Sequence, residues 1–237
     1  MYFTIAVSGK KQSGKDTLVD FLDPLFSSSG TVESFSFADE LKKFLIVGLG
    51  LKHEGLYGTN EQKNELTEYL WDNFPYEIRR SNALNDSIDP RSGPMTNREI
   101  MQVFGTDIMR SYFDDKIWVN SCFRSIEKSG VDVAFVPDMR FPSELNPWIE
   151  QDGLIIRLMR DVSEGDSHSS ETALDDWDWE QYGDRVLVIP EDSSIEDCRR
   201  LTLEWLVVHA KVFLQGREDY SEKLAVLEMA LGELTNE

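Results

Sequence analysis

The stretch that decides the fold is "SGKKQSGKDT" at residues 8–17. It nearly matches the phosphate-binding loop pattern G-x-x-x-x-G-K-[ST], with Gly9, Gly14 and Lys15 at the required positions. An apolar run, "YFTIAV" at 2–7, precedes the loop and has the character of a buried strand, and a helical pattern follows it. A strand, a glycine-rich loop and a helix in this order present backbone amides to a phosphate group. The segment therefore predicts a phosphate site in which Lys15 neutralises the β- and γ-phosphates.

The residue that follows Lys15 departs from the motif. A hydroxyl that contacts Mg²⁺ is required there, but the residue is Asp16, and Thr17 follows one position later. A carboxylate also suits Mg²⁺, directly or through water, and Thr17 could supply the hydroxyl if the helix starts later. The alternative is that Asp16 only complements the positive end of the helix dipole, and we favour the metal role. Lys10 and Ser13 are counted with the phosphate-binding positions, although Lys10 and Lys11 are expected on the loop's outer surface as solvated charges.

Composition narrows the class of protein. The chain has 237 residues, is 41% hydrophobic and carries a formal net charge of -20, which argues against a nucleic-acid binder because such a protein needs a basic surface. No apolar run is long enough to span a membrane, and the N-terminus has no basic signal region. Cys122 and Cys198 suit a reducing cytoplasm, and the three histidines form no metal-ligand spacing. We therefore expect a cytoplasmic protein with small-molecule partners.

Strand and helix patterns alternate along most of the chain. Four further strands are predicted from apolar, β-branched runs at 31–37, 131–136, 154–159 and 185–189. Amphipathic helices are predicted between these strands. Alternation of this kind implies a parallel sheet that is covered on both faces. The predicted fold class is α/β: a P-loop NTPase three-layer sandwich with a mostly parallel five-stranded sheet flanked by helices and a helical insertion.

We expect a single kinase-like domain over residues 1–237 with three additions. Residues 50–95 are polar and loop-rich, with a helix near 60–72, and are interpreted as an insertion or lid that binds substrate. A polar loop at about 160–174 is interpreted as a second lid segment, which would bring Arg160 onto the transferring phosphate. The tail at about 194–237 contains two amphipathic helices that divide near Gly216.

A helix is predicted to begin in "PMTNREIMQVFG" at 94–105. Thr96 and Glu99 form a capping box, with Met95 and Ile100 at the positions of a hydrophobic staple and Gly105 as the expected stop.

The polar face of this helix is a candidate substrate site. Arg98, Gln102 and Thr106 are spaced by four residues and would share one face, and Asp107 and Arg110 follow the expected break. Arginine suits a phosphate and an amide suits a base edge. An ordinary solvated face explains the pattern equally well, and the sequence leaves the two interpretations open.

A second candidate lies in "VAFVPDMRFPSEL" at 133–145. Here an apolar strand ends in Asp138, a carboxylate that could hold Mg²⁺ or its waters, and Arg140 and Glu144 follow. Aspartate is common in turns, so the signal gains its force from the phosphate loop earlier in the chain.

Taken together, these segments resemble the bacteriophage-type deoxynucleoside monophosphate kinases of the P-loop kinase superfamily. Dephospho-CoA kinase and animal phosphomevalonate kinase have related folds. The matching pieces run in order from about residue 5 to about residue 174: "SGKKQSGKDT", "FADELKK", "LYGTNEQKNELT", "NREIMQVFGTDIMR", "PDMRFPSE" and "HSSE". The G-K-D-T form of the loop is typical of that family, and the R-x-x-x-Q-x-x-G-T-D-x-x-R string is the most specific of the matching pieces. "PEDSS" at 190–194 departs from the family, which often has an Asn-Asp-Gly-like turn near the adenine.

The resemblance implies transfer of the ATP γ-phosphate to a deoxynucleoside 5′-monophosphate with Mg²⁺. It implies that the 9–17 loop holds ATP and the metal, that Asp138 also serves the metal, and that Lys15, Asp138, Arg140 and Arg160 carry catalysis. The monophosphate site would comprise Asp39, Lys42, Arg98, Gln102, Thr106, Asp107, Arg110, Arg140 and Glu144.

Two rival functions remain at this point. One is a P-loop kinase for another small phosphorylated acceptor, although such kinases lack the R-x-x-x-Q string. The other is a non-catalytic nucleotide-binding module, which would show no acceptor-dependent turnover. The C-terminal helices could pair two subunits into a homodimer, and a phage-encoded chain would act in the host cytoplasm.

Overall fold

The computed structural model describes residues 2–28, 30–80, 90–160, 172–213 and 220–235. The chain divides into two compact units, each described by itself below. The first comprises Met1–Ser36 and Phe123–Glu237, and the second comprises Phe37–Cys122. Most of the expected lid loop at 160–174 and the expected helix break at Gly216 lie outside the described residues.

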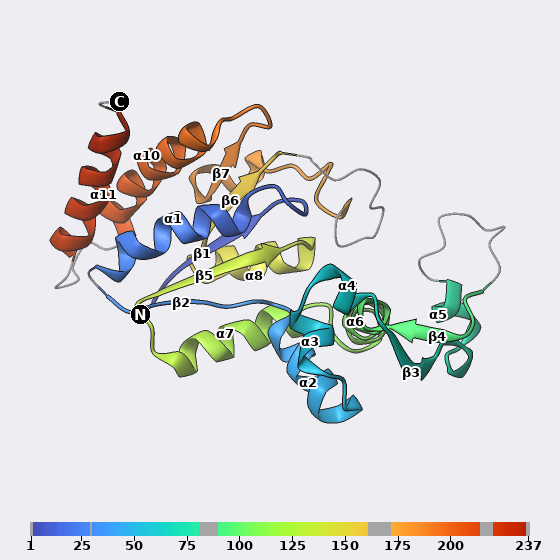
Figure 1. Cartoon of the computed structure of the whole chain (residues 1–237). Helices are drawn as coiled ribbons and strands as arrows, with labels where there is room; N and C mark the ends of the chain where they lie inside the picture. Colours follow the sequence, from blue (N-terminus) through green and yellow to red (C-terminus); the bar gives the residue numbers. More distant parts are fainter. Residues whose placement is uncertain (1, 29, 81–89, 161–171, 214–219, 236–237) are drawn as a thin grey trace. The chain divides into compact units, whose positions relative to one another are not determined.

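The first unit is built on a five-stranded parallel sheet, as the sequence predicted (Figure 1). The strand order is β2-β5-β1-β6-β7, so the strand that leads into the phosphate loop lies in the centre. The strands are β1 (Phe3–Ser8), β2 (Val32–Ser34), β5 (Val133–Met139), β6 (Leu154–Leu158) and β7 (Val186–Ile189).

Burial on both faces explains why β1 is a continuous apolar run. Ile5 pairs with Phe135 of β5 on one side and with Leu154 of β6 on the other. All six residues of β1 are buried, and a central parallel strand with helices on both sides has no polar face to present to water. Its carboxyl end therefore opens directly into the glycine-rich loop.

Helices α1 (Lys15–Ser27), α10 (Ile195–Phe213) and α11 (Tyr220–Thr235) lie on one face of the sheet (Figure 1). The two C-terminal helices agree with the prediction for the tail. They form one core with the sheet, to which the helices contribute Leu18, Val19, Leu22, Phe26, Leu203, Leu206, Val207, Leu227 and Ala230.

Helix α1 continues through Pro24 and ends at Ser27, the first residue of "SSSG" at 27–30. The extra turn buries Phe26, whose ring packs against Phe3 at 6.1 Å and Phe135 at 5.9 Å. Burial of a large aromatic side chain contributes about 1.5–3 kcal/mol, which offsets the backbone hydrogen bond that proline cannot donate.

On the other face of the sheet, α8 (Pro142–Glu150) buries Trp148. Its indole Nε1 donates to the backbone oxygen of Leu154 at 3.0 Å, and its ring stacks on Phe123 with centroids 4.9 Å apart. Phe123 lies in α7 (Ile117–Ser129), whose apolar side chains Trp118, Cys122, Phe123 and Ile126 are all buried. Trp148 therefore connects α8 to the start of β6.

The second unit combines short helices with a two-stranded antiparallel sheet. Its elements are α2 (Asp39–Leu49), α3 (His53–Tyr57), α4 (Asn60–Lys63), β3 (Leu66–Leu70), η1 (Trp71–Asn73), α5 (Tyr76–Arg80), β4 (Pro94–Thr96), α6 (Asn97–Gln102) and η2 (Val103–Phe113).

The helix predicted near 60–72 is wrong beyond its first turn. α4 stops at Lys63, and the chain then forms β3, which pairs with β4. The Thr67 hydroxyl donates to the backbone oxygen of Met95 at 2.9 Å, so pairing with a distant segment decides the structure here. Sheet pairing of this kind overrides local helix propensity.

The capping box at the start of α6 is confirmed. Glu99 N donates to the Thr96 hydroxyl at 3.2 Å, and Thr96 N donates to the Glu99 carboxylate at 2.8 Å. Met95 and Ile100, the two staple residues, are fully buried.

Gly105 does not end the helix as predicted, because the chain continues as a π-helix to Phe113. A Cβ at Gly105 would lie 2.8 Å from Leu41 Cδ2, and its carbonyl accepts a hydrogen bond from Trp118 Nε1 at 2.9 Å. Glycine is therefore required for close packing. The i→i+5 bonding also changes the spacing, so Thr106 does not continue the four-residue face of Arg98 and Gln102.

We predict that Trp148→Phe lowers the stability of the first unit by about 1–3 kcal/mol, because the buried Leu154 carbonyl loses its donor. Thermal unfolding followed by circular dichroism measures the loss. Trp177→Phe is the matched control, because its indole N–H has no hydrogen-bond partner in the structure. Equal losses in the two variants would contradict the assignment.

Candidate functional site

Two glycines shape the loop between β1 and α1. A Cβ at Gly9 would lie 2.5 Å from Ser13 Oγ and 3.1 Å from the backbone oxygen of Leu158, so no larger residue fits. Gly14 has φ 100°, a left-handed conformation that favours glycine. Ser13 is buried, and its hydroxyl has no hydrogen-bond partner in the structure. A buried polar atom without a partner beside a cavity is consistent with a site that receives a polar ligand.

Lys15 lies across this loop. Its side chain is buried, and its Nζ donates to the backbone oxygens of Gly9 at 2.8 Å and Lys10 at 2.6 Å. Burial, together with the nearby positive charge of Arg140, lowers the pKa of Lys15 to about 8. The ammonium is therefore held where an incoming anion would stabilise it.

Arg140 follows β5 and is positioned through its backbone. Its N–H donates to Glu144 Oε2 at 2.7 Å, and the N–H of Phe141 donates to the same oxygen at 3.0 Å. Glu144 is only 1% exposed. The structure thus places the Glu144 carboxylate on the first turn of α8, where it fixes the backbone that carries Arg140.

Asp138 lies near the carboxyl end of β5, where Ser36 Oγ donates to its Oδ2 at 2.6 Å. Its charge raises the pKa of Lys15, and so does that of Asp16. Asp16 and Thr17 are exposed in the first turn of α1. The carboxylates of Asp16 and Asp138 thus lie close enough to act on the charge of Lys15, and carboxylate oxygens are hard ligands that fit Mg²⁺.

Arg157 is a residue that sequence reasoning missed. It lies near the carboxyl end of β6 and is 5% exposed, and its Nη1 donates to Ser8 Oγ at 3.1 Å. Its guanidinium lies 5.3 Å from the ring of Trp179 and 3.9 Å from Asp175, and its positive charge also lowers the pKa of Lys15. A charged residue within "LIIRLM" was the available signal, because a buried cation needs specific partners.

The expectation that Lys10 is a solvated charge is wrong. Its Nζ pairs with Asp175 at 3.0 Å, and its side chain is 19% exposed. Asp175 comes from a segment far along the chain, just before η3 (Glu180–Arg185), so the pairing is not visible in the local sequence. The loop is therefore linked through Asp175 to the buried Arg157.

A cavity that is open to solvent adjoins the loop. Residues of four segments line it: the loop and α1, the end of β6, the end of β7 with the turn after it, and the start of α10. They are Ser13, Gly14, Thr17, Leu18, Leu158, Met159, Arg160, Ile189, Pro190, Ser193, Ile195, Cys198 and Arg199. The mixture of apolar walls with a few polar groups is typical of ligand pockets.

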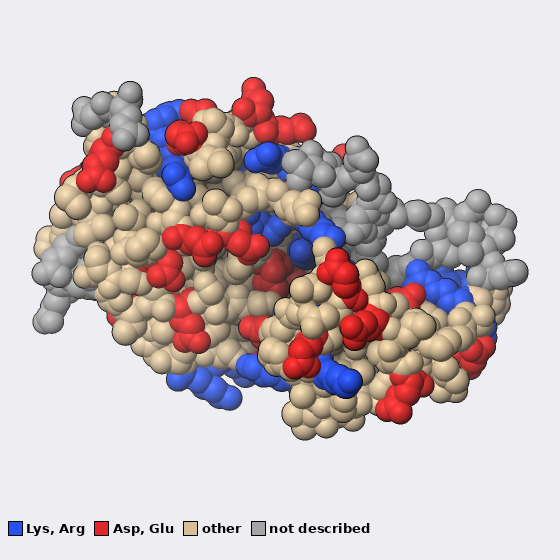
Figure 2. Space-filling model, in the orientation of Figure 1, with Lys and Arg blue, Asp and Glu red and all other residues tan. Residues whose placement is uncertain are grey.

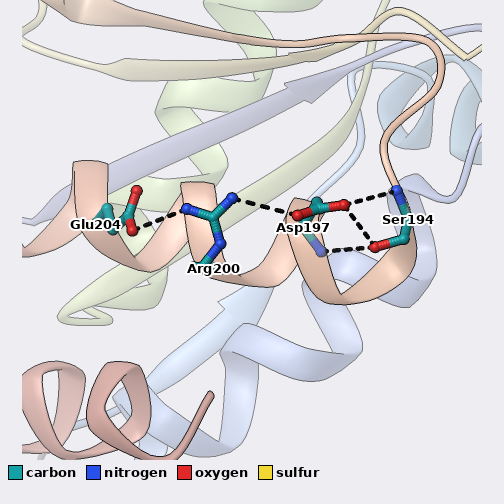
Figure 3. Close-up of polar contacts among 4 residues, drawn as sticks. All are labelled: Ser194, Asp197, Arg200 and Glu204. Carbon is teal, nitrogen blue, oxygen red and sulfur yellow. Dashed lines mark hydrogen bonds and ion pairs between the residues drawn. The ribbon is translucent and has the colours of Figure 1, made fainter. Parts of the chain in front are cut away.

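The turn "PEDSS" thus lines the cavity, and the start of α10 makes it rigid (Figure 3). Ser194 Oγ donates to Asp197 Oδ2 at 2.8 Å, and Asp197 N donates back to the Ser194 hydroxyl at 3.0 Å. Arg200 then bridges Asp197 at 3.2 Å and Glu204 at 3.0 Å. These hydrogen bonds lower the pKa of Asp197 and fix the helix end that carries Cys198.

Arg160 is exposed and lines this cavity. The rest of the expected lid, residues 161–171, lies outside the described residues.

The second unit holds the other predicted substrate residues. In α2, Lys42 Nζ lies 3.8 Å from Asp39 and 4.4 Å from the centre of the Tyr57 ring. Burial, together with the charge of Asp39 and a hydrogen bond to it, raises the pKa of Tyr57 to about 12. Asp39 and Lys42 are therefore brought together with an aromatic ring.

Arg98 lies on α6, and its guanidinium donates to Asn64 Oδ1 at 3.0 Å and Asn60 Oδ1 at 3.1 Å. Gln102 ends the same helix. Thr106, Asp107 and Arg110 lie on the π-helix η2, and Arg110 Nη1 donates to the backbone oxygen of Asp115 at 3.3 Å. The structure describes the two units separately, so it does not test whether these residues meet Arg140.

Acidic side chains are spread over the face of the molecule in view in Figure 2, with basic ones in separate groups among them. This agrees with the net charge of -20. Among the described residues, no helix is both long and apolar enough to cross a membrane.

A central parallel strand, a glycine-rich loop closed over a buried lysine and an adjoining cavity are typical of the P-loop NTPase fold. Comparison with known proteins gives the family. A sequence profile described as "Deoxynucleotide monophosphate kinase" matches residues 56–200, more than half of the chain. The chain therefore belongs to the deoxynucleotide monophosphate kinase family, and it is a nucleotide kinase that uses ATP.

Individual relatives agree with this assignment. The chain is 27% identical to the deoxynucleotide monophosphate kinase of Enterobacteria phage T4, over 81% of this chain and 94% of the relative. It is 24% identical to that of Escherichia phage RB69, over 81% and 95%. A protein of Acanthamoeba polyphaga mimivirus, provisionally given the same name, is 28% identical over 72% of this chain and 81% of its own length.

We predict that Lys15→Met changes the pH dependence of folding stability. Because the folded pKa is near 8 and the unfolded value is 10.5, the folded wild type binds fewer protons between these values, so its stability rises with pH through this window. Methionine carries no such charge. The free energy of unfolding of the variant, relative to wild type, should therefore fall by about 2 kcal/mol between pH 7 and pH 9.5. Urea unfolding at both pH values measures it, and a pH-independent difference would contradict the assignment.

Proposed function

We propose that this kinase transfers the γ-phosphate of ATP to a deoxynucleoside 5′-monophosphate, giving ADP and the deoxynucleoside diphosphate. The observation that carries the proposal is the buried Lys15 ammonium held across the loop beside a cavity that is open to solvent. Family membership supports the deoxynucleotide as acceptor.

The donor site is proposed to lie on the first unit. Amides of the loop and of the first turn of α1 would bind the phosphates of ATP, with Gly9, Lys10, Ser13, Gly14 and Lys15 as the loop residues. The base would enter the cavity between β6, β7 and α10, where Leu158, Ile189 and Pro190 offer apolar walls. "PEDSS" would then replace the family's usual turn at the adenine.

Catalysis would rest on position and charge. A phosphate monoester dianion is already nucleophilic, so no strong base is required, and the barrier falls when acceptor and donor are held in line. Lys15 and Arg140 would neutralise the charge that builds on the transferring group. Arg157 would add positive charge near Lys15, and Arg160 would lie at the edge of the cavity. Exclusion of water would favour transfer over hydrolysis.

Mg²⁺ fits the oxygen donors near the loop. Asp138, Asp16 and Thr17 would hold the ion or its waters, and such ions usually need only one or two carboxylates together with substrate phosphates. When bound, the ion supplies charge neutralisation at the β- and γ-phosphates.

The residues expected to bind the acceptor stay predictions: in the second unit Asp39, Lys42, Arg98, Gln102, Thr106, Asp107 and Arg110, and in the first unit Arg140 and Glu144. The hydrogen bonds of Arg98 to two asparagines support a role in a polar site, because they hold the guanidinium in a fixed position. Glu144 would act through the backbone of Arg140. A homodimer and a place in the host cytoplasm stay predictions.

We predict that deoxynucleoside monophosphates stimulate ADP release from Mg·ATP. A coupled spectrophotometric assay with dGMP, dTMP, dCMP, dAMP and their ribose forms, added one at a time, identifies the acceptors.

In the same assay, Lys15→Ala should lower turnover by at least about 100-fold, because a preorganised charge near the transferring group is lost. Lys11→Ala, a lysine of the same loop, is the matched control. ADP release that no monophosphate stimulates would overturn the proposal.

We predict that ATP protects Cys198 from alkylation. Cys198 is half-buried and lines the cavity, whereas Cys122 is buried and serves as an internal control. Burial raises the pKa of the Cys198 thiol, so labelling with a small iodoacetamide at pH 8 should be slow enough to follow by mass spectrometry. Protection by ATP and not by an equal concentration of pyrophosphate would support base binding in this cavity. Equal labelling with and without ATP would contradict it.

A further inference from the structure

Two hydroxyl–carboxylate hydrogen bonds join β2 and β5 at their opposite ends. Before β2, Thr31 Oγ1 donates to Asp132 Oδ2 at 2.9 Å. After β2, Ser36 Oγ donates to Asp138 Oδ2 at 2.6 Å. Because the strands are parallel, the first pair lies at the amino end of the sheet and the second at the carboxyl end. The phosphate loop begins at that same carboxyl end, after β1.

The sheet fixes the position of the Ser36 hydroxyl. Ser34 pairs with Phe135, and the N–H of Phe35 donates to the backbone oxygen of Phe135 at 2.7 Å, so the ladder extends to the residue before Ser36. Asp138 lies three residues further along the partner strand. Both groups therefore project from backbone that is already held by hydrogen bonds.

The contact has the geometry of a strong hydrogen bond. A hydroxyl that donates to a carboxylate gives a charge-assisted bond, and distances of about 2.5–2.7 Å are typical of such bonds. Ser36 and Asp138 are both half-buried, which reduces competition from water. One oxygen of the carboxylate is thus tied to a fixed donor, and this limits rotation of the whole carboxyl group.

We propose that Ser36 is a positioning residue that orients the Asp138 carboxylate for Mg²⁺. This rests on the proposed metal role of Asp138. Groups that hydrogen-bond to a metal-binding carboxylate set its orientation, and their loss typically weakens metal binding about 10- to 100-fold. Ser36 would act through Asp138 and would not touch the nucleotide.

A purely structural role is the competing explanation. Ser36 is the last residue of the N-terminal segment of the first unit, so its hydrogen bond could simply hold the end of β2 where the chain leaves the sheet. The Thr31–Asp132 pair separates the two explanations. It joins the same strands and makes further bonds, because Thr31 N donates to Asp132 Oδ2 at 2.9 Å and Asp132 N donates to Thr31 Oγ1 at 3.1 Å. Thr31→Ala therefore disturbs strand pairing at least as much as Ser36→Ala does.

The test measures metal binding without turnover. Mn²⁺ is titrated into the full chain with ADP, and the free ion is followed by electron paramagnetic resonance. We expect Ser36→Ala to weaken Mn²⁺ binding about 10-fold. Thr31→Ala should bind Mn²⁺ like the wild type, and Ser36→Thr, which keeps the hydroxyl, should restore most of the affinity. Circular dichroism confirms that each variant is folded.

Asp138→Asn distinguishes the metal role of Asp138 from the positioning role of Ser36. If it weakens Mn²⁺ binding while Ser36→Ala does not, the positioning role is overturned and the metal role of Asp138 stands. If Asp138→Asn leaves Mn²⁺ binding unchanged, the metal role fails, and the positioning role fails with it. Equal weakening by Thr31→Ala and Ser36→Ala would also overturn the proposal, because strand pairing alone would then explain both.

Discussion

The ammonium of Lys15, buried against two backbone carbonyls of its own loop, is the interaction on which the site depends. Removing a charge from water costs free energy, and the depressed pKa of this lysine expresses that cost. Arg140 and Arg157 add positive charge nearby, so cations are concentrated at this point in a chain whose net charge is -20. A bound phosphate would relieve this repulsion, which is why an arrangement unfavourable without ligand suits a binding site.

Sheet topology makes this concentration of charge possible. β1 lies between β5 and β6, and the carboxyl ends of parallel strands meet at one edge. Asp138 comes from one neighbour and Arg157 from the other, although more than a hundred residues separate each from the loop. The stable apolar core beneath the edge, which includes Ile5, Phe135 and Ile156, provides the free energy that offsets the strained electrostatics above it.

What the sequence could predict follows the range of the interactions involved. The five strands and the Thr96 capping box depend on short apolar runs or on residues three apart, and both predictions are confirmed. The helix near 60–72 and the stop at Gly105 fail because β4 and Leu41 decide those regions from elsewhere in the chain. The roles of the predicted site residues stay predictions, since composition and spacing give no distances between side chains.

Arg157 was not predicted for the same reason: its partners Ser8 and Asp175 come from distant parts of the chain.

Asp16 stands where the phosphate-loop pattern requires serine or threonine. The sequence left two roles open, a metal ligand or a partner of the helix dipole. The structure adds a third effect, because Asp16 raises the pKa of Lys15 against burial and the nearby arginines. A serine or threonine there could not do so, since a hydroxyl carries no charge. The carboxylate thus helps to keep the loop lysine protonated near neutral pH, where phosphate binding requires its charge.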